Sequence, residues 1–328
     1  MATAQLDQAD IESFLLASYQ SLRKLIAGRV SSPHDGPGIT AHTLPPLSAI
    51  DDAISALPNP SAPEFLTARG ASDTLDHILN ELAPAFNNQS LSGRYYGFVT
   101  GGVLPVAEAA DNVVTALDQN VQVHLPGHSA AAAVEDSALA MVVALLELGD
   151  ERAWPGRTFT TGATGGNILG LACGREAVIA RKNGGASVAE MGLLAACQAA
   201  GVTEVQVLTS MGHSSLSKAA SVVGLGHHAV KELRASEEEP WRLDLDAVER
   251  ELQREGVASI IVVSAGEVNT GRFATNALDM PKLRSLADRH GAWIHVDGGM
   301  LPTKSPCSTA TTLSCNIFLA LCPWYSNS

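Results

Sequence analysis

Residues 204–225, EVQVLTSMGHSSLSKAASVVGL, contain a strand, a short loop and a helix in one run. The first seven residues, EVQVLTS, have the apolar, β-branched character of a buried strand. The stretch SSLSKAASVVGL has helical spacing and begins at a serine that can cap a helix. The loop between them carries His213 at the carboxyl end of the strand, which is the edge where α/β proteins bind their ligands.

The same alternation of strand and helix continues on both sides of this stretch. The predicted strands are RTFTTG, EVQVLTS, HHAVKEL, SIIVVSAG and AWIHVDG, at 157–162, 204–210, 227–233, 259–266 and 292–298. The predicted helices between them cover 165–182, 214–225, 244–256 and 280–291. Strands that alternate with helices imply βαβ units. The sequence therefore predicts an α/β fold with a mostly parallel sheet and helices on both faces.

The amino-terminal part of the chain is predicted to be helical. Apolar residues recur at helical spacing over 8–28, 46–57, 73–86, 105–121 and 130–148. The last of these is apolar nearly all round, so we expect it to be buried. The stretch GRYYGFVTGG, at 93–102, is aromatic and then glycine-rich, which suits a loop that lines a cleft. We expect three parts: a helical segment at 1–90, a ligand-binding domain at 91–298, and a disordered tail at 299–328 without helical or strand period.

Composition excludes several classes of partner. The chain has 328 residues, of which 46% are apolar and 17% charged, so it can build a substantial core. Its net charge of −13, with no basic cluster, argues against a nucleic acid or an anionic membrane as partner. The first residues lack the pattern of a secretory signal, and no apolar run has the length of a membrane span. The five cysteines form no CxxC pair, so we expect a cytoplasmic protein without a disulfide framework or a metal site.

Residues 159–171, FTTGATGGNILGL, place small residues at the turn between a strand and a helix. The free N–H groups at the start of the helix, together with the hydroxyls of Thr161 and Thr164, suit a phosphate group. The turn is neither a GxGxxG fingerprint nor a P-loop, which disfavours a nicotinamide dehydrogenase. The alternative is a tight turn whose glycines serve close packing alone.

Asp297 ends the last predicted strand after a strongly apolar run, so its carboxylate needs a partner. A protonated ring nitrogen, a metal, a ribose hydroxyl or an arginine would serve, and the alternative is an N-cap or an internal salt bridge. His213 suits stacking on a planar cofactor or proton transfer, unless it is a loop histidine whose hydrogen bonds are satisfied. His295 lies on the same face of the strand as Asp297 and is a candidate to support it.

Taken in order, GRYYGFVTGG, TTGATGGN, GHSSLSKAASVVGLG, VSAGEVNTG and HVDGG resemble the motifs of the group II pyridoxal-phosphate-dependent amino-acid decarboxylases. This family includes the aromatic-amino-acid, tyrosine and glutamate decarboxylases, and the resemblance runs from Ser90 to Gly298. It implies a fold-type-I large domain that binds pyridoxal 5'-phosphate and decarboxylates an L-amino acid, with aromatic substrates favoured by GRYYGF. It also implies a homodimer in which the amino-terminal helices pack against the partner subunit.

The resemblance also implies roles for individual residues. Ala163 and Thr164 match the pair that contacts the cofactor phosphate. His213 matches the catalytic histidine that stacks on the cofactor ring, and Asp297 matches the aspartate that pairs with the ring nitrogen. The remaining matches are Gly298 and Thr270 for the cofactor, and Phe98 and Thr100 for the substrate.

The sequence departs from the family in two places. Glu267 stands where well-known members carry threonine. The family's cofactor-bearing lysine lies in a His-Lys pair, which this sequence lacks, and Lys304, the only lysine after Asp297, comes too early for that role. The family's carboxyl-terminal small domain is missing as well.

These departures lead to an expectation about the tail. Gly299-Met300 allows the codons GGT-ATG, which contain the intron-like sequence GTATG, so we expect the tail to derive from a retained intron or a frame error. The alternatives to a decarboxylase are a catalytically inactive truncated isoform and a different reaction of the same cofactor, such as transamination.

Overall fold

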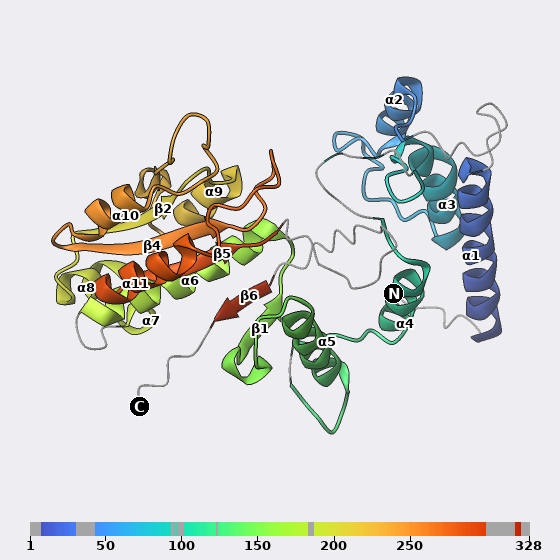
Figure 1. Ribbon diagram of the computed structural model, residues 1–328. Helices are drawn as coiled ribbons and strands as arrows, with labels where there is room; N and C mark the ends of the chain where they lie inside the picture. The colour runs from blue at the N-terminus through green and yellow to red at the C-terminus, as the bar shows by residue number, and fades with distance from the viewer. Residues whose placement is uncertain are drawn as a thin grey trace. The chain divides into compact units, whose positions relative to one another are not determined.

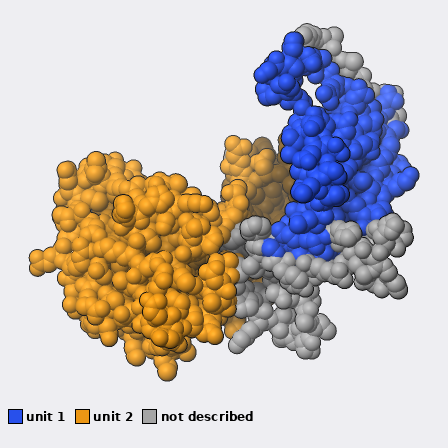
Figure 2. All heavy atoms as spheres, turned by 90° about the horizontal axis from the view of Figure 1, so that it is seen from above, with its two compact units in different colours: residues 1–108 blue, residues 109–328 orange. Residues whose placement is uncertain are grey.

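The computed structural model describes residues 8–30, 43–92, 95, 97, 102–122, 124–182, 187–299 and 319–322. The chain divides into two compact units, 1–108 and 109–328, which Figure 2 colours separately. This division falls after Glu108, later in the chain than the predicted end of the helical segment at residue 90. Within the described ranges, no helix combines the length and the apolar character that crossing a membrane requires.

The first unit is helical. Its elements are α1 Gln8–Val30, α2 Leu47–Ala56, α3 Ala71–Asp76, the π-helical η2 His77–Leu82, the 3-10 helix η3 Ala83–Ala85 and the start of α4 Pro105–Ala116. The helices predicted at 8–28 and 46–57 are confirmed. The one predicted at 73–86 is divided into three segments, and Pro84 in the last of them lacks the N–H that an α-helix would use there. Of the hydrophobic residues described in this unit, only Ala53 and Ala83 are buried.

Helix α5, Ala131–Leu145, differs from its prediction as a buried helix. Leu139, Val142 and Val143 are buried, but Val134 is 65% exposed and Met141 is 70% exposed. The helix packs against β1, Gly156–Phe159, and against the short η5, Glu151–Ala153. Only one of its faces is therefore covered by the described part of this unit, although a helix that is apolar all round favours cover on every side.

The second unit is built on a parallel sheet. Its strands are β2 Glu204–Thr209, β3 Val230–Glu232, β4 Val257–Ser264 and β5 Trp293–Asp297, in the order β3-β2-β4-β5 (Figure 1). Val207 stands opposite Val230 and Ile260, and Ser264 stands opposite Asp297. All three pairings are parallel, which confirms the predicted α/β class.

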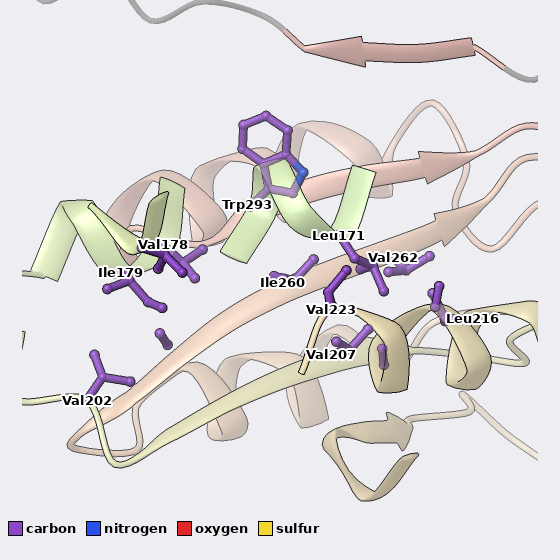
Figure 3. Close-up of a cluster of buried hydrophobic side chains, with 14 of the residues drawn as sticks. Leu171, Val178, Ile179, Val202, Val207, Leu216, Val223, Ile260, Val262 and Trp293 are labelled. Atoms are coloured by element: carbon purple, nitrogen blue, oxygen red, sulfur yellow. The ribbon is translucent and has the colours of Figure 1, made fainter. Parts of the chain in front are cut away.

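Helices cover both faces of this sheet (Figure 1). One face packs against α6 Ala163–Lys182, α8 Leu193–Ala199 and α9 Ser214–Val222, and the other against α10 Leu245–Leu252 and α11 Asp279–His290. In Figure 3, side chains of α6 and α9 meet those of β2, β4 and β5 in the first of these two cores. Helix α8 and the short α7, Val188–Met191, were not expected from the sequence.

Strand β1 corresponds to the predicted strand RTFTTG, but it lies outside the parallel sheet. It pairs antiparallel with β6, Leu319–Cys322, so that Gly156 stands opposite Cys322 and Phe159 opposite Leu319. The apolar run LALC thus supplies a partner for β1, which differs from the expectation of a tail without strand pattern. Residues 300–318 and 323–328 lie outside the described part of the chain.

Two elements begin differently from their predictions. Helix α9 is capped by the ring of His213 rather than by a serine hydroxyl, because His213 Nδ1 accepts the backbone N–H of Ser215 at 3.2 Å. The strand predicted at 227–233 begins with a 3-10 turn, η6 His227–Ala229, and only Val230–Glu232 pairs in the sheet. Gly226, with φ of 83°, redirects the chain just before that turn.

Helix α6 lies close to β5 because glycines face the strand at four-residue spacing. A Cβ atom at Gly174 would lie 2.8 Å from Trp293 Cδ1 and 3.2 Å from Ile260 Cδ1. One at Gly170 would overlap the ring of His295. These two glycines therefore serve close packing, and for Gly170 this was the alternative interpretation of the motif at 159–171.

The variant Gly174→Ala should lower the free energy of unfolding by up to about 2 kcal/mol. The added methyl group overpacks the contact with Trp293, and this cost of about 1–3 kcal/mol exceeds the gain of about 1 kcal/mol in helix propensity. The control is Gly28→Ala in α1, where a Cβ atom meets nothing within 4 Å. Urea denaturation followed by circular dichroism measures both variants. If Gly174→Ala stabilises the protein as Gly28→Ala is expected to, the packing argument fails.

Charged side chains join β2, β3 and α10 at the amino-terminal side of the sheet. Lys231 Nζ lies 2.8 Å from Glu204 Oε1 and 3.1 Å from Glu251 Oε2, and Arg254 Nη2 lies 2.6 Å from Glu204 Oε2. Hydrogen bonds from Arg254 and then Lys231 lower the pKa of Glu204 to about 2 from its usual 4.5. The ionised carboxylate of Glu204 is therefore bound more favourably in the folded than in the unfolded chain.

The destabilisation caused by Glu204→Gln should depend on pH. A depressed carboxyl pKa stabilises the fold fully above pH 4.5, and this stabilisation is lost as the pH falls towards 2. The difference in urea midpoint between wild type and Glu204→Gln should thus be larger at pH 6 than at pH 3. Urea denaturation at these two pH values measures it. Exposed Glu255→Gln is the control. An equal difference at both pH values would contradict the assignment.

Candidate functional site

The carboxyl ends of β2, β4 and β5 form the candidate site. The chain leaves β2 for its neighbour β3 and leaves β4 for its neighbour β5 on the opposite side, so the strand order reverses between β2 and β4. The two crossover helices, α9 and α11, accordingly lie on opposite faces of the sheet. A reversal of this kind opens a crevice at the carboxyl ends of the strands, where ligands bind. His213 follows β2, Glu267 follows β4, and Asp297 ends β5.

Asp297 is held at this edge by its backbone and by one oxygen of its side chain. Its carbonyl oxygen accepts the N–H of Ala265 at 2.8 Å, which continues the pairing of β4 with β5. Its Oδ2 atom accepts a hydrogen bond from Asn167 Nδ2 at 3.1 Å. Its Oδ1 atom accepts only a long bond of 3.4 Å, from the N–H of Gly299, among the described contacts. Oδ1 is therefore available to a further donor.

His213 is anchored through one ring nitrogen only. Its Nδ1 atom lies 2.8 Å from Ser215 Oγ and 3.2 Å from Ser215 N, and both contacts hold the ring at the start of α9. The residue as a whole is exposed. A ring that is fixed at one edge and open to solvent on its faces can stack on a planar group.

Asn167 links these two residues, which the sequence had proposed separately. Besides its bond to Asp297, its Nδ2 atom donates to Ser215 Oγ at 3.1 Å. Its Oδ1 atom lies 2.7 Å from His295 Nε2. The structure therefore connects Asp297 with His213 through Asn167 and Ser215, and it places His295 in the supporting position expected from its strand face.

Asn167 and Ser215 were not predicted as site residues, although both lie in the motifs TTGATGGN and GHSS. Both side chains are buried, Asn167 with 3% and Ser215 with 3% of the residue exposed. A buried amide in an apolar helix needs partners for each of its polar atoms, and this requirement is the signal that could have found Asn167.

The start of α6 offers an anion site beside this network. The helix begins at Ala163, after Gly162, whose φ is 152° and whose carbonyl oxygen accepts the hydroxyl of Thr160 at 2.9 Å. Thr164 is exposed, and the first backbone N–H groups of a helix have no partner within the helix. A helix start of this kind, with the positive end of the helix dipole, suits an anion, and the phosphate contact of Ala163 and Thr164 stays a prediction. Asn167 follows one turn later on the same helix.

Two further side chains near the site, those of Glu267 and Thr270, form hydrogen bonds within their own loop. The Glu267 carboxylate accepts hydrogen bonds from Asn269 N at 2.9 Å and from Thr270 N. Burial raises the pKa of Glu267, but the hydrogen bonds from Thr270 and Asn269 outweigh it and bring the pKa below its usual value. Thr270 is exposed, and its hydroxyl accepts the N–H of Arg272, so its described hydrogen bonds are internal to this turn.

The other predicted site residues are placed only in part. Gly298 follows Asp297 directly and is partly exposed. Phe98 and Thr100, expected at the substrate, lie outside the described residues, as does Lys304.

The polar groups at this edge fit a pyridoxal-phosphate cofactor. Thr209 Oγ1 and Ser210 Oγ, at the carboxyl end of β2, are buried without a hydrogen-bond partner in the described part of the chain. Buried hydroxyls of this kind mark places where a ligand or water supplies the missing partner. Together with the open Oδ1 of Asp297 and the helix start at Ala163, they provide acceptors for a ring N–H and donors for a phosphate.

The family-model and curated-protein searches found no match for the chain. Its structure, however, is similar to solved decarboxylase structures. The glutamate decarboxylase domain of diaminobutyrate-pyruvate transaminase and L-2,4-diaminobutyrate decarboxylase from Vibrio parahaemolyticus matches 91% of this chain, with a TM-score of 0.66 and 24% identity. Oryza sativa TDC with PLP and tryptamine matches 90%, with a TM-score of 0.63 and 18% identity. Catharanthus roseus tryptophan decarboxylase in complex with L-tryptophan matches 90%, with a TM-score of 0.63 and 15% identity.

The chain covers 60%, 56% and 58% of these three structures, respectively. Identities in this range show a common fold and leave the reaction open. The match agrees with the resemblance found in the motifs, and partial coverage is consistent with a fold-type-I large domain. The described chain therefore has the fold of the group II pyridoxal-phosphate-dependent decarboxylases over most of its own length.

Proposed function

We propose that this chain binds pyridoxal 5'-phosphate at the carboxyl edge of β2, β4 and β5, and that the complete protein decarboxylates an L-amino acid. The observation that carries the proposal is the hydrogen-bonded connection from Asp297 through Asn167 and Ser215 to His213. It joins a carboxylate that can pair with a ring nitrogen to an imidazole that can stack on the same ring.

Ala163 and Thr164 would hold the cofactor phosphate at the start of α6. Backbone N–H groups and the helix dipole stabilise negative charge there without a basic side chain. This suits a chain whose net charge is −13. The phosphate would fix one end of the cofactor and so determine which part of the ring reaches Asp297.

Asp297 would pair with the protonated nitrogen of the ring. Its Oδ1 atom has room for this N–H, and the bond from Asn167 to Oδ2 fixes the orientation of the carboxylate. When bound, the cofactor supplies an electron sink for the charge left behind as CO₂ departs from an amino acid. The role of Asp297 is to keep the positive charge on the ring nitrogen, on which that capacity depends.

His213 would cover one face of the ring, and Gly298 would leave space beside Asp297. The two contacts from Ser215 to Nδ1 restrain rotation of the imidazole, so its face is positioned before the cofactor arrives. A restrained partner loses little conformational entropy on binding. Thr270 remains a proposed contact on the neighbouring turn.

The reaction itself belongs to the complete protein in this proposal. The sequence has no His-Lys pair, and the chain covers only 55% to 60% of the solved structures it matches. Tryptophan and tryptamine are bound by two of the similar structures, which supports an aromatic L-amino acid as the substrate class. Phe98 and Thr100 are the proposed substrate contacts.

A homodimer is part of the same proposal. The first unit buries only Ala53 and Ala83 among its described hydrophobic residues, while Leu15, Leu16 and Leu66 are 59%, 61% and 90% exposed. Apolar helices with so little core of their own gain most by packing against another surface, and a second copy of the chain supplies one. An inactive chain that pairs with an active subunit would use the same helices.

The variant Asp297→Asn should weaken binding of pyridoxal phosphate by about 10- to 100-fold, because a charge-assisted pair with the ring nitrogen is lost. Quenching of tryptophan fluorescence and the absorbance of the bound cofactor measure the affinity. Inorganic phosphate, which competes only for the start of α6, should bind the variant and the wild type equally.

The exposed Asp246→Asn variant serves as the control, since Asp246 lies on α10 and away from the site. Wild-type protein that is folded by circular dichroism but does not bind the cofactor would refute the proposal. Equal affinities for wild type and Asp297→Asn would refute the role of this carboxylate.

A further inference from the structure

We infer that Asn167 is the positioning residue of this site, and that its amide fixes the direction of every hydrogen bond between Asp297, His295 and His213. In this arrangement both histidines carry their proton on Nε2. The inference concerns the protein before any ligand binds, and its consequence for pyridoxal phosphate rests on the proposed function.

The place of Asn167 follows from the register between α6 and β5. Gly174 faces Trp293 and Gly170 faces His295, so the next turn towards the start of the helix brings Asn167 to Asp297. Trp293, His295 and Asp297 occupy every second position of β5, so their side chains lie on one face of the strand. Asn167 is therefore fixed by the same close packing that the glycines permit.

The chemistry of its neighbours determines which way the amide points. An ionised carboxylate only accepts hydrogen bonds, so the side-chain NH₂ of Asn167 must face Asp297. Its two hydrogens are then used by Asp297 Oδ2 and Ser215 Oγ, both at 3.1 Å. The reverse orientation would place the amide oxygen against the carboxylate and leave Asp297 without this donor.

This orientation sets the tautomer of His295. The amide oxygen of Asn167 lies 2.7 Å from His295 Nε2 and can only accept, so Nε2 must carry the proton. Burial lowers the pKa of His295, and the carboxylate of Asp297 opposes part of that effect. A neutral His295 with its proton on Nε2 satisfies the amide without adding a charge next to Asp297.

The orientation of the Asn167 amide also affects His213, because Ser215 lies between the two side chains. Because Ser215 Oγ accepts from Asn167, its own hydrogen is free to be donated to His213 Nδ1 at 2.8 Å. The backbone N–H of Ser215 also points at Nδ1, at 3.2 Å. Nδ1 therefore accepts twice, and the proton of the neutral ring is placed on Nε2, on the edge away from α9.

The amide of Asn167 thus orients both groups that are proposed to contact the cofactor, Asp297 and His213. It occupies Oδ2 of Asp297 and leaves Oδ1 for a ring N–H, and it directs the hydroxyl of Ser215 towards His213 Nδ1, which the backbone N–H of Ser215 also contacts. Leucine at position 167 would have a similar volume but could donate nothing. Aspartate there would put a second carboxylate beside Asp297, which disfavours ionisation of both.

The test begins with the wild-type chain, without any ligand. Long-range ¹H–¹⁵N correlation spectra of the imidazole nitrogens distinguish the two tautomers of each histidine. We expect His213 and His295 to be protonated on Nε2. Either histidine found with its proton on Nδ1 would overturn the inference, whether or not the chain binds pyridoxal phosphate.

Three variants then separate the steps of the network. Asn167→Leu should release His295 into a mixture of tautomers, whereas Ser215→Ala should leave His295 on Nε2. In Ser215→Ala the backbone N–H of residue 215 still faces His213 Nδ1, so His213 should keep its proton on Nε2 and show a shifted Nδ1 signal, because the hydroxyl donor is lost. The control, Asn276→Leu, removes a similar amide that donates to Asp279 at 2.8 Å on α11, and it should change neither histidine. If Ser215→Ala leaves the His213 Nδ1 signal unshifted, or if Asn167→Leu folds and leaves the His295 signal unchanged, the inference is wrong.

Cofactor titrations complete the experiment. Asn167→Leu should bind pyridoxal phosphate about 10-fold more weakly than wild type, which corresponds to about 1.4 kcal/mol, and it should bind inorganic phosphate equally well. Loss of both affinities would mean that the residue only supports the fold. A wild-type chain that binds no cofactor would contradict the proposed function but leave the tautomer measurement as a valid test of Asn167.

Discussion

The close contact between α6 and β5 is the constraint on which the rest of the site depends. Gly170 and Gly174 leave no side chain between the helix and the strand, so the His295 and Trp293 rings lie directly against the helix backbone. This contact fixes the register of the two elements. The first turns of α6 consequently reach the carboxyl end of β5, where Asn167 meets Asp297. The helix start at Ala163 and the carboxylate at the strand end are thus positioned by the same packing contact.

The electrostatics of the site follow from that register. Asp297 sits at the edge of a sheet whose interior is apolar, and an unpaired carboxylate in such a place is costly. Asn167 reduces the cost with a neutral donor, which leaves the charge of Asp297 uncompensated and one oxygen open. An arginine at this position would form a stronger pair but would compete with a cationic ligand for the carboxylate. A neutral partner therefore suits the role proposed for Asp297, which is to stabilise positive charge on a bound ring.

Sequence reasoning reached the parallel sheet because each of its units carries a local signal. Buried strands such as 257–264 are continuous apolar runs, and helices such as 279–290 have a clear period and a glycine stop. His213 and Asp297 were predicted because both end or follow strands at the ligand-binding edge. Asn167 and Ser215 were not, because their roles arise from contacts across 130 and 48 positions of sequence. The separate placement of β1 was missed for the same reason, since strand partners are chosen by the whole fold.

The glycine-rich motif and the rest of helix α6 combine close packing against β5 with candidate site residues. From the sequence, its glycines suited either a phosphate turn or close packing, and the structure shows close packing at Gly170, while the phosphate turn stays a prediction. The first residues, around Ala163, offer free N–H groups, while Gly170 and Gly174 contact β5 one and two turns later. Asn167 lies between these regions, and its side chain contacts groups from two other elements, β5 and α9. A change at Gly170 would push the ring of His295, which would move Nε2 away from Asn167 and disturb a hydrogen-bond direction that extends to His213. A residue that contacts no ligand can in this way influence the tautomer of a histidine that is proposed to contact one.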